Sequence, residues 1–154
     1  MKKKLVFKNF DQVRLDCEYN NRKRVPDVEK IYNSWVKPCQ SVINKCHANL
    51  DIPYGPGERQ KIDLILPEAK GLIPVNLYFH GGFWMSRSKS DQTFVAKPFV
   101  EAGGAFGLIE YDLIPNVRMA EIVKQCRAAV FWVFKNAKRF NIDPNRIFIS
   151  GHSA

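Results

Sequence analysis

The spacing of apolar residues in the opening third of the chain predicts helices. Across Asp27–Trp35 the apolar side chains recur every three or four residues, which places them on one helical face. Pro38 is expected to interrupt this helix, and the apolar residues of Val42–Cys46 form a second, shorter helical stripe. We therefore expect residues 1–50 to form a helical extension, followed by a body made of residues 51–154.

Four short apolar runs in that body predict β-strands. They are Ile62–Leu66, Val75–Phe79, Phe106–Tyr111 and Arg146–Ser150. Helical patterns near residues 91–102 and, more strongly, near residues 117–140 separate the last three runs. Parallel neighbours need a crossover helix between them, so this alternation predicts a single α/β domain with a mostly parallel sheet and flanking helices. In such sheets the functional groups lie at the carboxyl ends of the strands.

Composition adds little to this fold prediction but narrows the partners. The 154 residues are 45% hydrophobic and 25% charged, which is typical of a compact globular domain. The net charge of +9 fits either an anionic partner or a basic surface. The clusters Lys2–Lys4 and Arg22–Arg24 are short and carry no nucleic-acid signature, which favours the basic surface. No apolar run approaches the ~18 residues of a membrane span, so we expect neither a nucleic-acid nor a membrane partner.

Cysteine usage indicates a reducing compartment. The four cysteines are irregularly spaced and no CxxC pair is present. Cys39 with the Cys46-His47 pair matches no zinc module, so no metal and no cofactor are expected. These features favour a cytoplasmic protein whose cysteines stay as thiols.

The sequence Gly151-His152-Ser153-Ala154 directly follows the last predicted strand. It supplies four of the five positions of a Gly-x-Ser-x-Gly nucleophile elbow, in which a sharp turn from strand to helix exposes the serine. An ordinary turn is the alternative for so short a motif, but its position after a buried strand favours the elbow. Ser153 is therefore the candidate nucleophile.

A second glycine-bearing loop, His-Gly-Gly-Phe-Trp, follows the second predicted strand. Backbone N–H groups in such a loop can stabilise the negative oxygen of a tetrahedral intermediate. The expected donors are Gly82 and Phe83, together with Ala154, while His80 and Gly81 support the loop. A plain flexible turn is the alternative, but the order of the two loops and the βα unit between them favour an oxyanion hole.

These motifs together resemble the α/β-hydrolase branch that holds kynurenine formamidase (arylformamidase) and related esterases. The resemblance spans nearly the whole chain and includes the N-terminal stretch Leu15–Arg22. The other motifs that carry it are Tyr54–Gly57 before Ile62-Asp63-Leu64, His80–Trp84, Tyr111–Pro115 and Gly151–Ala154.

The resemblance implies hydrolysis of an aryl formamide or a small carboxylic ester through an acyl-enzyme on Ser153. The substrate would be a small acyl compound, and Phe83, Trp84 and Tyr111 are candidates for an aromatic pocket. Core packing of the loop is an equal alternative for Phe83 and Trp84. Asp112 is expected to be structural rather than a member of a catalytic triad.

The chain departs from the family pattern in one respect. The triad of α/β-hydrolases runs serine, acid, histidine, so both partners should follow Ser153. We therefore expect a piece of a longer polypeptide, truncated after the elbow and inactive alone, with Ile147–Ile149 on an exposed edge strand. The alternative is a non-catalytic remnant that acts as a binding or interaction module. The choice between formamide and ester, and a homodimer, stay open.

Overall fold

The computed structural model describes residues 4–154, which form two compact units, Met1–Ser34 and Trp35–Ala154. In the first unit, β1 (Leu5–Phe7) and β2 (Phe10–Asp11) form a small antiparallel pair. The helices α1 (Gln12–Tyr19) and α2 (Asn21–Arg24) follow. The carboxylate of Asp11 begins α1 by accepting the backbone N–H of Arg14 at 2.8 Å, the usual role of an N-cap aspartate.

Helix α3 (Val28–Lys45) corrects the expected break at Pro38, because this proline lies inside one continuous helix. A proline removes a single helical hydrogen bond, and the turns on either side keep theirs. Cys39 and Val42, directly after the proline, are buried. Packing of this face therefore holds the helix together where local preference alone favours an interruption.

The expected boundary between residues 50 and 51 is also wrong, because it falls inside a strand. The helical part ends at Lys45, and β3 (His47–Pro53) joins the sheet by pairing antiparallel with β4 (Lys61–Leu66). Most residues of β3 are exposed or only half-buried, because the strand lies at one edge of the sheet. Such a strand lacks the apolar run by which the other strands were recognised.

The second unit has the expected α/β architecture with flanking helices, and its sheet is mixed. The other strands are β5 (Ile73–Phe79), β6 (Ala105–Ile109) and β7 (Ile142–Gly151), and the order is β3-β4-β6-β5-β7. The β3–β4 and β4–β6 pairs are antiparallel, whereas β6–β5 and β5–β7 are parallel. A mostly parallel sheet was expected. No helix separates β4 from β5, so the chain reverses there without the crossover that a parallel pair requires.

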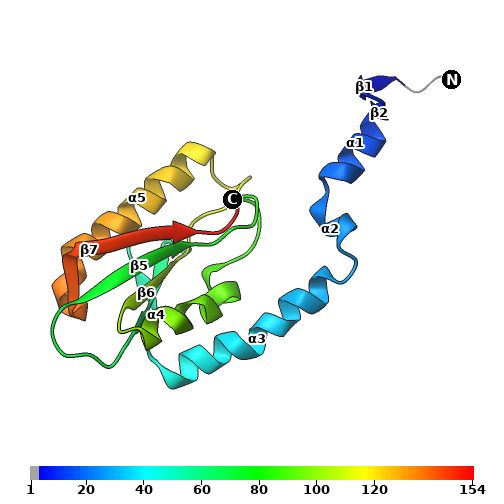
Figure 1. Ribbon diagram of the computed structural model, residues 1–154. Helices are drawn as coiled ribbons and strands as arrows, with labels where there is room; N and C mark the ends of the chain where they lie inside the picture. The colour runs from blue at the N-terminus through cyan, green and yellow to red at the C-terminus, as the bar shows by residue number, and fades with distance from the viewer. Residues whose placement is uncertain (1–3) are drawn as a thin grey trace. The chain divides into compact units, whose positions relative to one another are not determined.

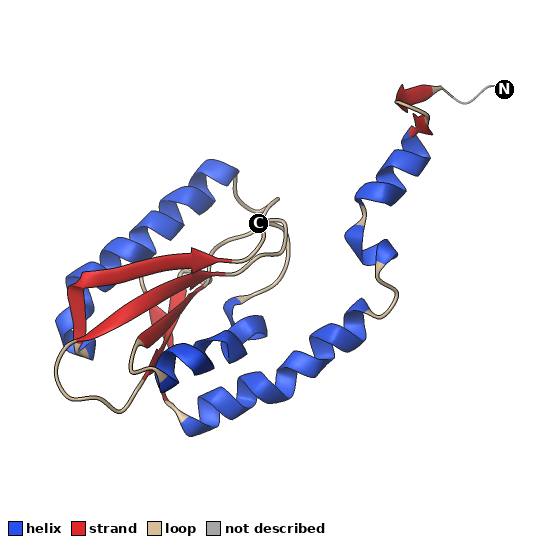
Figure 2. Cartoon of the chain, in the orientation of Figure 1, coloured by secondary structure: helices blue, strands red, loops and turns tan. Residues whose placement is uncertain are grey.

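Helices cover the two faces of this sheet (Figures 1 and 2). After β5, the 3₁₀ helix η1 (Lys89–Ala96) and α4 (Lys97–Glu101) pack on one face together with the end of α3. After β6, α5 (Met119–Asn136) and η2 (Ala137–Phe140) pack on the other face. The chain therefore leaves β5 and β6 in opposite directions, which opens a crevice position at the carboxyl ends of β5 and β7.

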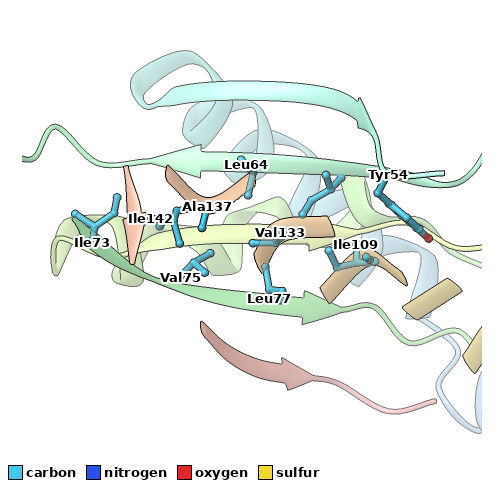
Figure 3. Packing of buried hydrophobic residues seen from close by; sticks show 12 residues of the cluster. Tyr54, Leu64, Ile73, Val75, Leu77, Ile109, Val133, Ala137 and Ile142 are labelled. Atoms are coloured by element: carbon cyan, nitrogen blue, oxygen red, sulfur yellow. The ribbon is translucent and has the colours of Figure 1, made fainter. Parts of the chain in front are cut away.

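Alternation along the strands supplies a core on each face. The larger core lies between the sheet and α5 (Figure 3). Its buried members are Tyr54, Ile62, Leu64, Ile73, Val75, Leu77, Ala105, Ile109, Ala129, Val133, Ala137 and Ile142. The smaller core faces α3, η1 and α4 and contains Val42, Ile65, Tyr78, Ala96, Phe106 and Leu108. The central strands are thus buried on both sides and form a rigid base for the loops that follow them.

Candidate active site

The two glycine-bearing loops meet because β5 and β7 are parallel neighbours that end together. Phe79, the last residue of β5, is paired with Gly151, the last residue of β7. The carbonyl oxygen of Phe79 also accepts the backbone N–H of His152 at 3.3 Å. A Cβ on Gly151 would lie 3.1 Å from that same oxygen, which is closer than a side chain ordinarily comes. The sheet therefore places residues 80–84 beside residues 152–154.

Ser153 lies in the sharp turn directly after β7. Its φ angle is +60°, in the left-handed region that residues other than glycine rarely adopt. Its side chain is exposed. Backbone strain of this kind concentrates at functional sites, and a strained serine after a strand is the geometry of a nucleophile elbow.

The first loop fits against this turn because it has glycine at two positions. A Cβ on Gly81 would lie 2.4 Å from the carbonyl oxygen of His152 and 2.9 Å from the Cβ of Ser153. Gly82 has a φ angle of +136°, and a Cβ there would lie 1.9 Å from the carbonyl oxygen of Ser86. Neither position has room for a side chain, so the loop can approach the serine only with this sequence.

The expected oxyanion donors point at a common position. The backbone N–H of Gly82 donates to the carbonyl oxygen of Ala154 at 2.8 Å, and the backbone N–H of Phe83 donates to the same oxygen. Two amides that converge on one oxygen beside a serine form the donor arrangement that a developing oxyanion needs. Ala154, expected as a third donor, takes part here through its carbonyl oxygen.

The aromatic residues of the site divide into two groups. Phe83 is 71% exposed, and Trp84 is partly buried with its ring centroid 5.5 Å from that of Phe83. Tyr111 is fully buried, stacks on the ring of His80 with centroids 4.4 Å apart, and donates its hydroxyl to the His80 carbonyl oxygen. Burial raises the pKa of Tyr111 to about 12. The expected place of Tyr111 in a substrate pocket is therefore wrong, because its ring lies beneath the loop.

His80 supports the loop through a network that the sequence did not reveal. Its Nε2 lies 2.9 Å from Oε1 of Glu110, and its Nδ1 lies 2.8 Å from the carbonyl oxygen of Gly81. The same Oε1 accepts from the guanidinium of Arg59 at 2.5 Å, and Oε2 accepts the backbone N–H of Lys89 at 3.1 Å. One available signal was a single carboxylate at the end of the apolar run Phe106–Tyr111. Such a buried charge needs partners.

Lys89 also has charged partners of its own. Its Nζ lies 2.6 Å from Oδ2 of Asp63, a buried residue of β4, and 3.0 Å from Oδ1 of Asp51. Burial alone would lower the pKa of Lys89, but the hydrogen bonds and charges of Asp63 and Asp51 outweigh burial and raise it. The end of the loop region is thus tied to the sheet by both the backbone and the side chain of Lys89.

The remaining titratable candidates lie apart from Ser153. Asp112 is paired with the side chain of Gln125 in α5, at 2.8 and 2.9 Å, which fits a structural role. His47 is exposed on β3, at the opposite edge of the sheet from β7, and His152 is also exposed. The described residues contain no group of histidine, cysteine or acidic side chains placed to share a metal ion. No helix among them combines the length and apolarity needed to cross a membrane.

Comparison with known proteins gives the same picture. The BD-FAE family model matches residues 62–154. Kynurenine formamidase of Salmo salar is 34% identical over 106 residues, which are 68% of this chain and 35% of that protein. Isoprenylcysteine alpha-carbonyl methylesterase ICME of Arabidopsis thaliana is 30% identical over 104 residues, 67% of this chain and 24% of that protein. The chain thus spans about a third or less of the length of these relatives.

A solved structure supports the fold over a longer stretch. A protein of Silicibacter sp. TM1040, provisionally described as a thioesterase, is 32% identical and superimposes with a TM-score of 0.75. The match covers 87% of this chain and 49% of that one.

Proposed function

Because this chain belongs to the BD-FAE family of α/β-hydrolases, we propose that the full-length protein is a serine hydrolase acting through an acyl-enzyme on Ser153. The substrate class is an aryl formamide or a small carboxylic ester, as in relatives named for formamidase and methylesterase activities. The observation that carries the proposal is the convergence of the Gly82 and Phe83 amides on one oxygen beside the strained Ser153.

The proposed reaction follows from these positions. Ser153 Oγ attacks the carbonyl carbon of the substrate and gives its proton to a general base. The carbonyl oxygen becomes negative and accepts the N–H groups of Gly82 and Phe83, with Ala154 as the expected third donor. Collapse of this intermediate breaks the bond to the amine or alcohol, which leaves with the proton. Water then attacks the acyl-serine, releases the acid and restores the Oγ–H bond.

The general base is proposed to lie outside the 154 residues. Both ring nitrogens of His80 already have acceptors, and His47 lies on the far edge of the sheet. The order of triad residues in α/β-hydrolases places the acid and histidine after the serine. We therefore propose that the 154-residue chain alone is inactive, and that its activity belongs to the full-length polypeptide.

Labelling by a fluorophosphonate tests this function directly. The full-length protein should be labelled at Ser153, and Ser153→Ala should abolish both labelling and turnover. Comparison of kcat/KM for an aryl formamide and an aryl acetate then identifies the substrate class. An intact fold without labelling would sink the proposal and favour the non-catalytic binding module.

The 154-residue chain provides a second test. Its purified form should not hydrolyse either substrate. Ester turnover by this chain that disappears in Ser153→Ala would overturn the proposal that its base lies elsewhere, and would also exclude the binding module.

We also propose a cytoplasmic location, on the basis of four cysteines that are all free thiols in the structure. Fractionation of cells with the full-length protein tests this. Recovery in a secreted or membrane fraction would contradict it.

A further inference from the structure

The carboxylate of Glu110 bridges the two ends of the loop that carries the oxyanion donors. Its Oε1 lies 2.9 Å from Nε2 of His80, the first residue of the loop. Its Oε2 accepts the backbone N–H of Lys89, nine residues later, at 3.1 Å. Glu110 follows the last residue of β6, and only 6% of it is exposed, so it is fixed by the sheet rather than by the loop.

Further donors hold the carboxylate in one orientation. The Arg59 guanidinium donates to Oε1 at 2.5 Å and also donates to the backbone oxygens of Tyr111, at 2.8 Å, and Arg87, at 3.1 Å. The hydroxyl of Tyr54 donates to the backbone oxygen of Glu110 at 2.6 Å. A buried carboxylate with several charge-assisted hydrogen bonds has little freedom to rotate.

The partners of His80 make the bridge specific for a group that accepts twice. Both of its ring nitrogens face acceptors, so both contacts are hydrogen bonds only when His80 carries two N–H groups. The ring is also stacked on Tyr111 with an interplanar angle of 6°. His80 is therefore held in position and orientation, and Gly81 and Gly82 extend directly from it.

We propose that Glu110 is a positioning residue for the oxyanion hole. Its carboxylate holds both ends of loop 80–89, so that the N–H groups of Gly82 and Phe83 point at the oxygen that becomes negative. The inference rests on the proposed function, because it assigns the network a role in that reaction. Glu110 touches no reacting atom, so its loss should change the transition state more than substrate binding.

Glu110→Gln is the sharpest variant because it keeps the shape and removes one acceptor. A glutamine offers one oxygen, so its NH₂ group must face either the Lys89 N–H or the donors of Arg59 and His80. One end of the loop is then released. Glu110→Asp keeps both acceptors and the charge on a shorter side chain, so it should restore part of the function.

A control must separate positioning from stability, since Glu110→Gln also leaves a buried donor without an acceptor. Val133→Ala in α5 provides one, because Val133 is fully buried in the larger core and touches none of the loop residues named above. It should lower the melting temperature of the full-length protein and leave kcat unchanged.

The experiment measures kcat and KM for an aryl ester in full-length wild type, Glu110→Gln, Glu110→Asp and Val133→Ala. Rates are normalised to the fraction of chains that a fluorophosphonate finally labels. We expect Glu110→Gln to lower kcat by about ten- to a hundredfold, below the 10²–10³ reported for loss of a whole donor. KM should stay within about twofold, and Glu110→Asp should have an intermediate kcat. If Glu110→Gln does not fold, Glu110→Asp gives the same test through its lower kcat at unchanged KM.

Two results would overturn the role of Glu110. One is a wild-type kcat per labelled serine in the folded Glu110 variants. The other is a kcat loss in Val133→Ala as large as that in Glu110→Gln. In both cases the wild type is still labelled at Ser153, whereas failure of the proposed function appears as an unlabelled wild type.

Discussion

A Cβ on Gly81 would lie 2.4 Å from the carbonyl oxygen of His152, so the loop after β5 rests directly against the turn that carries Ser153. Gly81→Ala must therefore displace one of the two. We expect it to cost about 1–3 kcal/mol of stability, as overpacking does. Phosphonate labelling of Ser153 in the full-length protein should slow at least about tenfold, because the donors and the serine lose their alignment.

Gly104→Ala is the matched control for this substitution. The nearest atom to a Cβ on Gly104 lies at 3.5 Å, an ordinary contact, and the residue precedes β6 at the end of the sheet opposite the site. Labelling should be unchanged in this variant. Equal labelling rates in Gly81→Ala and wild type would show that the loop does not rest on the elbow.

The left-handed backbone of Ser153 predicts a difference between two inactive variants. Alanine at a φ angle of +60° costs about 1–2 kcal/mol, whereas glycine adopts it freely but loses more entropy on folding. Ser153→Gly should therefore be about 1 kcal/mol more stable than Ser153→Ala. Urea unfolding of the full-length variants measures this, and coincident midpoints with equal slopes would show that the turn stores no strain.

The buried phenol of Tyr111 predicts a loss of stability at alkaline pH. Its pKa in the folded protein is about 12, against about 10 in the unfolded chain. Between these values the unfolded state releases a proton that the folded state keeps. The stabilisation is complete below pH 10 and falls by about 2–3 kcal/mol as the pH rises to 12.

Tyr111→Phe should remove this dependence. Its free energy of unfolding should fall less steeply than that of wild type between pH 10 and 12, measured by urea titration at each pH. The variant also loses the hydrogen bond to His80, so the comparison concerns the slope and not the absolute value. Parallel slopes would contradict the burial of the phenol.

The edge strand β7 predicts self-association of the 154-residue chain. Phe148 and Ile149 are 57% and 62% exposed, as the sequence led us to expect, and β7 has no neighbour beyond β5 among the described strands. A hollow beside Phe148, lined also by Asn76, Phe99 and Ala102, adds apolar surface and includes none of the candidate site residues. Unpaired backbone groups next to exposed apolar side chains promote strand-to-strand association.

Phe148→Lys should reduce this association, measured by light scattering as a function of concentration. Phe131→Lys is the control, because Phe131 is 60% exposed on α5, where the helix satisfies the backbone. Equal reductions in both variants would point to general surface hydrophobicity instead of the edge of the sheet.

The sequence by itself determined the parts of the protein that depend on neighbouring residues. Alternating apolar residues predicted four strands, and the stripe across residues 117–140 predicted the helical segment formed by α5 and η2. The glycines of the two loops marked turns that side chains would obstruct, and these turns include Ser153. Short-range periodicity and backbone sterics suffice for such features.

Tertiary structure alone decided which distant residues meet. The half-exposed edge strand β3, the antiparallel pairs and the continuous helix through Pro38 depend on packing partners far along the chain. Tyr111 and Glu110 took their places beneath the loop in the same way. A buried carboxylate must find donors somewhere, but which donors it finds is set by the order and register of the strands.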